Sequence, residues 1–160
     1  MQHHLAQINL ARFRLPMAHP ANKAFIDSLD RVNATAEAQP GFVWRLTGNG
    51  GNALDLRAYA DPDIAVNMSV WTDLDALAAF VYRNEAHRGI MRRRREWFDP
   101  LEVHMALWWV PAGHRPAVTE GVERLDWLRD RGPTAEAFDF RHPFPPTDGA
   151  EIAPVLDLCT

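Results

Sequence analysis

The segment Ile64–Trp71 (IAVNMSVW) alternates between two kinds of side chain, and this pattern constrains the fold more than any other in the chain. Successive side chains of a strand point to opposite faces of a sheet. The two sets here are Val66, Met68 and Val70 on one face, and Asn67, Ser69 and Trp71 on the other. The segment therefore predicts a strand that is covered on both faces, with the polar face beside a small-molecule site.

Three more strands and four helices are predicted by the period of the apolar residues and by capping and breaking residues. The strands are Leu5–Leu10, Phe42–Thr47 and Val103–Val110. The helices run from Asn22 to Gln39, through Leu74–Val81, from Asn84 to about Phe98, and over residues 119–131. Helices after the first and third strands predict a two-layer α+β fold in one domain over residues 1–146. We expect the tail over residues 147–160 to be partly disordered.

Charge and cysteine content narrow the classes of function. The formal net charge of the 160-residue chain is -4, so there is no general electrostatic attraction to nucleic acid and we expect no such partner. No apolar run is long enough to span a membrane, and the first residues lack the pattern of an export signal. We therefore expect a cytoplasmic protein without a membrane partner. Cys159 can form no disulfide within the chain.

The helix after Asn84 carries the most specific signal for a site. Six side chains recur on one face at three- and four-residue steps: His87, Ile90, Met91, Arg94, Trp97 and Phe98. We expect His87 and Arg94, the polar members of this stripe, to point inward as a catalytic pair. An inward guanidinium needs either a buried protein partner or an anionic ligand oxygen. His87 is likewise either a hydrogen-bonded structural residue or a general base.

Other polar and aromatic side chains are candidates for binding the substrate: Asn9, Asn67, Trp71, Trp97, His104 and Trp108. Large rings stack on planar ligands, and a few polar groups fix the ligand's orientation. Because His104 and Trp108 are four residues apart, a regular strand would place them on the same face. The alternative is that the aromatic rings only pack the core and that the amides bind the backbone. No Cys/His cluster has the spacing of a zinc site, so we expect no metal.

Four blocks of sequence carry a family resemblance: Pro40–Leu46 (PGFVWRL), Asn67–Trp71 (NMSVW), Arg93–Phe98 (RRREWF) and Leu107–His114 (LWWVPAGH). From about Leu5 to Phe144 the chain resembles the domain of unknown function 3291 family, which is related to the dimeric α+β barrel superfamily. The resemblance implies a ferredoxin-like protomer, with a four-stranded antiparallel sheet and helices on one face. It also implies a homodimer in which the open sheet face packs against a second copy. The superfamily includes cofactor-independent antibiotic-biosynthesis monooxygenases and heme-degrading monooxygenases.

Two readings of function follow. In the first, the protein is a cofactor-independent monooxygenase in which His87 or Arg94 stabilises the anion of a planar phenol and Asn67 and Trp71 position its ring. In the second, it is a non-catalytic dimeric protein that binds a hydrophobic or aromatic metabolite. A third alternative is heme, with His87 as its axial ligand. The heme-degrading relatives have a tryptophan where this chain has Phe80, which weakens that alternative.

Overall fold

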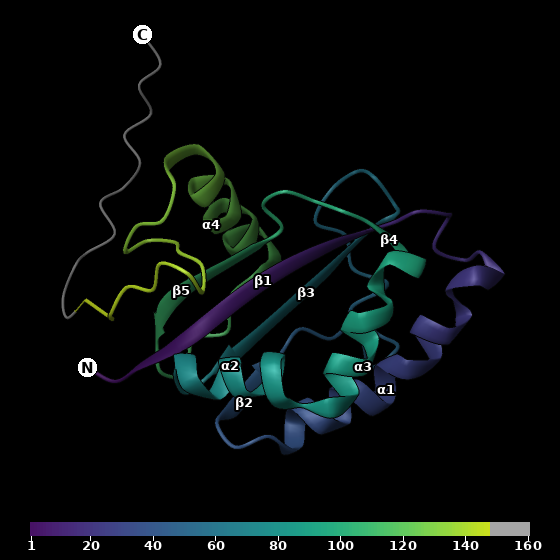
Figure 1. Cartoon of the computed structure of the whole chain (residues 1–160). Helices are drawn as coiled ribbons and strands as arrows, with labels where there is room; N and C mark the ends of the chain where they lie inside the picture. Colours follow the sequence, from purple (N-terminus) through teal and green to yellow (C-terminus); the bar gives the residue numbers. More distant parts are fainter. Residues whose placement is uncertain (148–160) are drawn as a thin grey trace, which may run out of the picture.

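The sheet is built around β1 (His3–Phe13), a long strand that crosses the molecule (Figure 1). The computed structural model describes residues 1–147. The other strands are β2 (Phe42–Arg45), β3 (Ile64–Trp71), β4 (Phe98–Asp99) and β5 (Met105–Pro111). The helices are α1 (Lys23–Ala38), α2 (Leu74–Arg83), α3 (Glu85–Arg93) and α4 (Val118–Arg131), with the short 3-10 helices η1 (Pro20–Asn22) and η2 (Arg94–Glu96).

All pairings of β1 are antiparallel. β3 pairs along one edge of β1, which brings Asn9 opposite Asn67. The other edge of β1 pairs first with β5 and then, at its C-terminal end, with β4. β2 lies outside β3 and completes the sheet. With α1 after β1 and with α2 and α3 after β3, this is the predicted ferredoxin-like α+β fold, to which β4 adds a short fifth strand.

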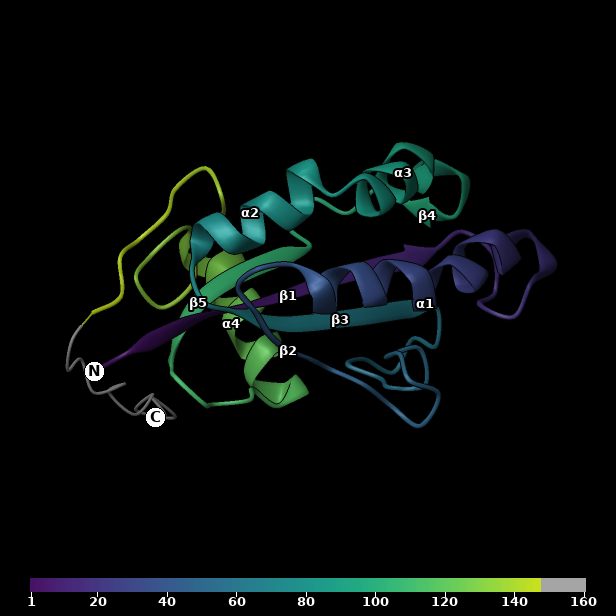
Figure 2. The same ribbon diagram turned by 90° about the horizontal axis from the view of Figure 1, so that it is seen from below.

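The two faces of the sheet are covered by different helices. α1, α2 and α3 lie on one side of the sheet and α4 lies on the other (Figure 2). We call these the α1–α3 face and the α4 face. The predicted alternation of β3 is confirmed, because Met68 and its apolar neighbours belong to the core of the α4 face, whereas Trp71 belongs to the core of the α1–α3 face.

α4 packs closely against the sheet. A Cβ atom at Gly121 would lie 2.9 Å from Ile8 Cδ1 and 3.0 Å from Met68 Cε, so the helix approaches the strands at its only residue without a side chain. Leu125 and Leu128 of the same helix are buried against this face. The α4 face is therefore covered within one copy. The expectation that it stays open for a second copy is wrong, because the C-terminal helix folds back across it.

The segment after α4 covers the outer edge of β5. Phe138 exchanges two backbone hydrogen bonds with Leu107, at 2.8 and 2.9 Å, and its side chain is fully buried. The expected disorder of the tail and the position of Cys159 lie outside the described residues. Within residues 1–147, no helix combines the length and the apolar character that crossing a membrane requires.

Candidate functional site

A row of polar side chains lies on the α1–α3 face where β1 and β3 pair, and we call it the polar floor: Gln7, Asn9, Asn67 and Ser69. Gln7 Nε2 donates to Asn67 Oδ1 at 2.7 Å and to Ser69 Oγ at 2.9 Å. Gln7 and Ser69 are buried and Asn9 is half-buried, but Asn67 is exposed although it lies within a strand. The helix layer therefore leaves the Asn67 end of the floor accessible from solvent.

His87 is fixed at the corner between α2 and α3 by two hydrogen bonds. Its backbone N–H donates to the capping oxygen Oδ1 of Asn84 at 3.1 Å. Its side-chain Nδ1 lies 3.1 Å from the carbonyl oxygen of Val81. Because a carbonyl oxygen only accepts hydrogen bonds, Nδ1 carries the proton and Nε2 holds a lone pair. Burial lowers the pKa of His87, against the opposing effect of the Val81 bond, so the imidazole is neutral at pH 7.

Ring contacts connect His87 to the polar floor. The His87 and Phe80 ring centroids are 4.8 Å apart, and Phe80 stacks on Trp71 at 5.3 Å. Trp71 Nε1 in turn donates to Ser69 Oγ at 2.8 Å. Trp71 is only 1% exposed, with Phe42 against its other side at 5.4 Å. The indole therefore holds one end of the floor through its N–H and offers no free ring surface for stacking.

Arg94 does not lie beside His87. Its side chain is exposed, and Nη1 donates to the Met91 carbonyl oxygen at 2.8 Å. α3 ends at Arg93, and the chain continues as η2, whose three residues per turn rotate the next side chains away from the helical stripe. The expectation that Arg94 points inward is wrong for this reason. Within residues 1–147 it forms no ion pair.

Trp97 belongs to an aromatic cluster at the far end of the α1–α3 face. Its ring lies 5.5 Å from that of Phe25, which also contacts Phe13 and Phe98. Trp97 is 1% exposed, so it too is a packing residue in this structure. Because Phe13 ends β1 and Trp71 pairs with Leu5 near its start, the polar floor lies between two aromatic groups.

His104 and Trp108 lie away from the polar floor. Trp108 is buried in the core of the α4 face, where Nε1 donates to Glu120 Oε1 at 3.0 Å. His104 is exposed and precedes β5, with Nδ1 3.2 Å from the Leu101 carbonyl oxygen. The expectation that they share a pocket with Trp71 is wrong, because the strand starts only at Met105 and Trp108 faces the opposite side of the sheet. In residues 1–147, no three His, Cys, Asp or Glu side chains could hold a metal ion.

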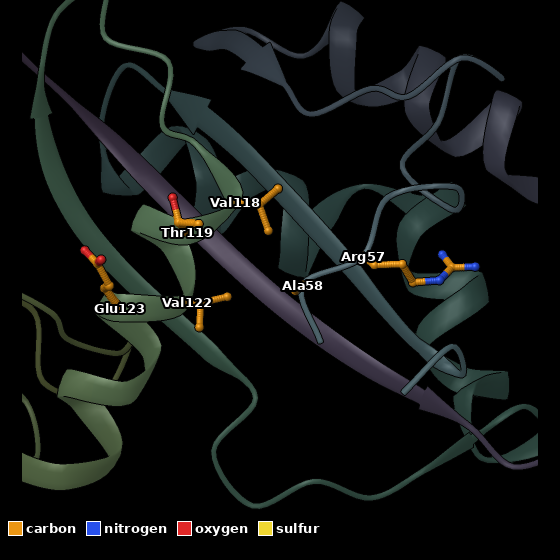
Figure 3. Close-up of a pocket in the computed structure, with 6 residues that line it drawn as sticks. All are labelled: Arg57, Ala58, Val118, Thr119, Val122 and Glu123. Atoms are coloured by element: carbon orange, nitrogen blue, oxygen red, sulfur yellow. The ribbon is translucent and has the colours of Figure 1, made fainter. Parts of the chain in front are cut away.

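A separate hollow of about 320 Å³ lies between α4 and the loop that follows β2. It is lined by Arg57, Ala58, Val118, Thr119, Val122 and Glu123 (Figure 3). Figure 3 shows that the guanidinium of Arg57 extends away from α4 and not toward it. None of the predicted site residues lines this hollow, so it is distinct from the polar floor.

Gln7, Ser69 and Phe80 connect the site but were not among the predicted site residues. The available signal was that both strands carry polar side chains at every second position, at residues 7 and 9 and at residues 67 and 69. That period places each pair on one face of its own strand. It does not give the register of β1 against β3, which is what brings Gln7 to Asn67.

Solved structures resemble this chain in fold at low identity. A conserved protein from Methanosarcina mazei Go1 has a TM-score of 0.50 and 13% identity, over 67% of this chain and 92% of that one. SnoaB, a cofactor-independent oxygenase from Streptomyces nogalater, has a TM-score of 0.45 and 20% identity, over 70% of this chain and 95% of its own. PA3566 from Pseudomonas aeruginosa has a TM-score of 0.47 and 15% identity, over 73% and 98%. At these identities the likeness concerns the fold alone.

A match to a protein family covers nearly the whole chain. The search of curated proteins found none that is significantly similar to this chain. The model of the family described as domain of unknown function DUF3291 matches residues 4–153, which include all four blocks of sequence that carry the resemblance. The chain is thus a member of the DUF3291 family.

Proposed function

We propose that this protein binds a planar phenolic small molecule over the polar floor and oxidises it with O₂ without a cofactor. The observation that carries the proposal is the state of His87: a neutral imidazole, fixed by hydrogen bonds to Asn84 and Val81, with a lone pair on Nε2. A neutral imidazole with a free lone pair can act as the general base that removes a proton from an acidic phenol or anthrone. The exposed Asn67 supplies a polar group that orients the ring.

The chemistry needs only the substrate and O₂. Nε2 of His87 takes a proton from the substrate, and the resulting electron-rich anion transfers electrons to O₂ and forms a carbon–oxygen bond. For an anthrone, the CH₂ group becomes C=O, while the second oxygen atom leaves as water with the two hydrogens. Oxidation of the substrate thus supplies every electron that O₂ accepts.

Oxygen consumption with 1,8-dihydroxyanthrone and hydroquinone tests the proposal. We expect His87→Gln to reduce kcat by about 10²–10⁴-fold, the usual contribution of a general base. His114→Gln is the matched control, because that imidazole is exposed and pairs with Glu120 on the α4 face. Equal rates in wild type and His87→Gln, after subtraction of spontaneous oxidation, would contradict the proposal. The catalytic role of Arg94 stays a prediction, which Arg94→Gln tests in the same assay.

Absence of oxygen consumption, together with an aromatic ligand that copurifies and stays unchanged in air, would instead favour the non-catalytic binding protein. Native mass spectrometry of the purified protein detects such a ligand. Light scattering on the same sample tests the homodimer, which stays a prediction. In this structure α4 covers the sheet face from which the dimer was inferred.

Heme ligation by His87 also stays a prediction. An axial imidazole usually donates its other N–H to a carbonyl or carboxylate, and Nδ1 of His87 does so to Val81. Bound heme would supply oxygen activation. The absorption spectrum of freshly purified protein tests this alternative. A Soret band that is present in wild type and absent in His87→Gln would favour heme binding over the cofactor-independent reaction.

A further inference from the structure

The hydrogen bonds of the polar floor have a direction. Trp71 Nε1 donates to Ser69 Oγ, and Gln7 Nε2 donates to Ser69 Oγ and to Asn67 Oδ1. The two hydrogens of the Gln7 amide are thereby both used, and the carbonyl oxygen of Asn67 is turned toward Gln7. Because Asn67 is exposed, its opposite end, the NH₂ group, is the part of the amide that is free to meet a ligand.

The partners of Gln7 are themselves fixed. Gln7, Ser69 and Trp71 are 5%, 7% and 1% exposed, so water competes little for their hydrogen bonds. Trp71 is held between Phe42 and Phe80, and its N–H can only donate. The Gln7 and Asn67 amides are therefore oriented as a pair, because reversing one of them alone would turn two acceptors or two donors toward each other.

We propose that Gln7 is a positioning residue that sets the hydrogen-bond polarity of the site and thereby its ligand class. With its NH₂ group facing outward, Asn67 selects a planar aromatic molecule that presents an acceptor oxygen at this point. A ligand that presents an N–H donor there would set that donor against the NH₂ group of Asn67, and neither would have an acceptor. This inference rests on the proposed function only in that a planar small molecule lies over the polar floor.

The inference is tested with two neutral probes that share one ring system: 2-acetylnaphthalene, which presents a carbonyl acceptor, and 2-aminonaphthalene, which presents donors. Their dissociation constants are measured by equilibrium dialysis, and the result is the ratio of the two affinities. We expect wild type to prefer the acetyl probe by about tenfold, the effect of one matched against one mismatched hydrogen bond.

Three variants separate orientation from simple loss of packing. Gln7→Met keeps a similar volume but cannot hold the Asn67 amide, so the ratio should fall toward one. Gln7→Glu places an acceptor at position 7, so the Asn67 amide must turn over, and the ratio should invert in favour of the amino probe. Ser69→Ala removes the two hydrogen bonds that Ser69 Oγ accepts, from Gln7 and from Trp71, but keeps the bond between Gln7 and Asn67, so the acetyl preference should persist.

A wild-type preference for the amino probe would overturn the inference without any variant. So would an unchanged ratio in Gln7→Met and Gln7→Glu when circular dichroism shows that both fold. Oxygen consumption with an unchanged ratio contradicts the role of Gln7 and leaves the oxygenase proposal standing. The expected ratios without oxygen consumption contradict the oxygenase and support the role of Gln7. If wild type binds neither probe, the inference falls.

Discussion

The two faces of the sheet differ in the side chains that they carry and in how these are covered. Met68 and Asn67 are neighbours in β3, yet Met68 is fully buried beneath α4, whereas Asn67 is exposed on the α1–α3 face. The α4 face combines apolar side chains of β1, β3 and β5 with Leu125 and Leu128 into a single core. The α1–α3 face interrupts its apolar surface with four polar side chains.

This difference shows how the fold can tolerate a polar site on one side of its central strands. Burial of apolar surface is the main source of stability, and polar groups under a helix layer contribute little of it. Because the C-terminal helix packs a second apolar core against the sheet, the α1–α3 face does not have to supply all of the packing. The extra helix thus stabilises a sheet whose opposite face holds the candidate site.

The comparison is tested most strongly by truncating the two neighbours in β3. We expect Met68→Ala to lower the free energy of unfolding by about 2–5 kcal/mol, because it leaves a cavity under α4. Asn67→Ala should lower it by only about 1 kcal/mol, since the side chain is exposed and loses one hydrogen bond with Gln7. Urea denaturation of both variants gives the values. Equal losses would show that the two faces contribute alike.

A second test concerns the close approach of α4. Gly121→Leu would force a side chain against Ile8 and Met68, and we expect a loss of about 1–3 kcal/mol in unfolding free energy. The matched control is Gly89→Ala in α3, where a Cβ meets no atom within 4 Å. That change should stabilise the protein by about 0.5–1 kcal/mol through helix propensity. Thermal unfolding measures both, and a tolerated leucine at position 121 would mean that α4 is not tightly seated.

The sequence predicted the bounds of the helices and strands better than it predicted which side chains pack together. The bounds of β3 are those predicted, and α4 begins one residue before its predicted start. These predictions depended on local period and on breaking residues such as Gly132. The direction of Trp108 depended on which face of the sheet β5 turns toward the helices, and no local pattern determines that.

Arg94 shows a second limit of sequence reasoning. Its expected direction assumed that one helix continues to Phe98, but the helix gives way to a 3-10 turn after Arg93. The direction of His87 was predicted because it lies in the first turn of α3, close to the Asn84 cap that fixes the start of the helix. The hydrogen bonds among Gln7, Asn67 and Ser69 required the register of β1 against β3, which only tertiary structure provides.

A third, smaller effect is expected from the indole that supports the polar floor. Trp71→Phe keeps an aromatic ring between Phe42 and Phe80 but removes the hydrogen bond to Ser69. The free energy of unfolding should fall by about 1 kcal/mol, because Ser69 keeps its bond from Gln7. Denaturation with urea measures this loss. A loss as large as that of Met68→Ala would mean that Trp71 carries core packing comparable to that of the α4 face.

The smallest expected effect is a pH dependence that comes from the α1–α3 face through His87. Burial lowers its pKa in the folded protein below the 6.5 of a free imidazole, so the unfolded chain binds the proton more tightly. Above pH 7.5 both states are neutral and His87 contributes no pH dependence. As the pH falls below 6.5, the unfolded state is protonated first, and the free energy of unfolding decreases.

In His87→Gln this contribution is absent. As the pH is lowered from 7.5 to 5.5, the unfolding free energy of wild type should therefore fall relative to that of the variant. Parallel curves for the two proteins in urea denaturation over this range would show that the imidazole binds its proton equally in the folded and the unfolded protein, which would contradict the lowered pKa of His87.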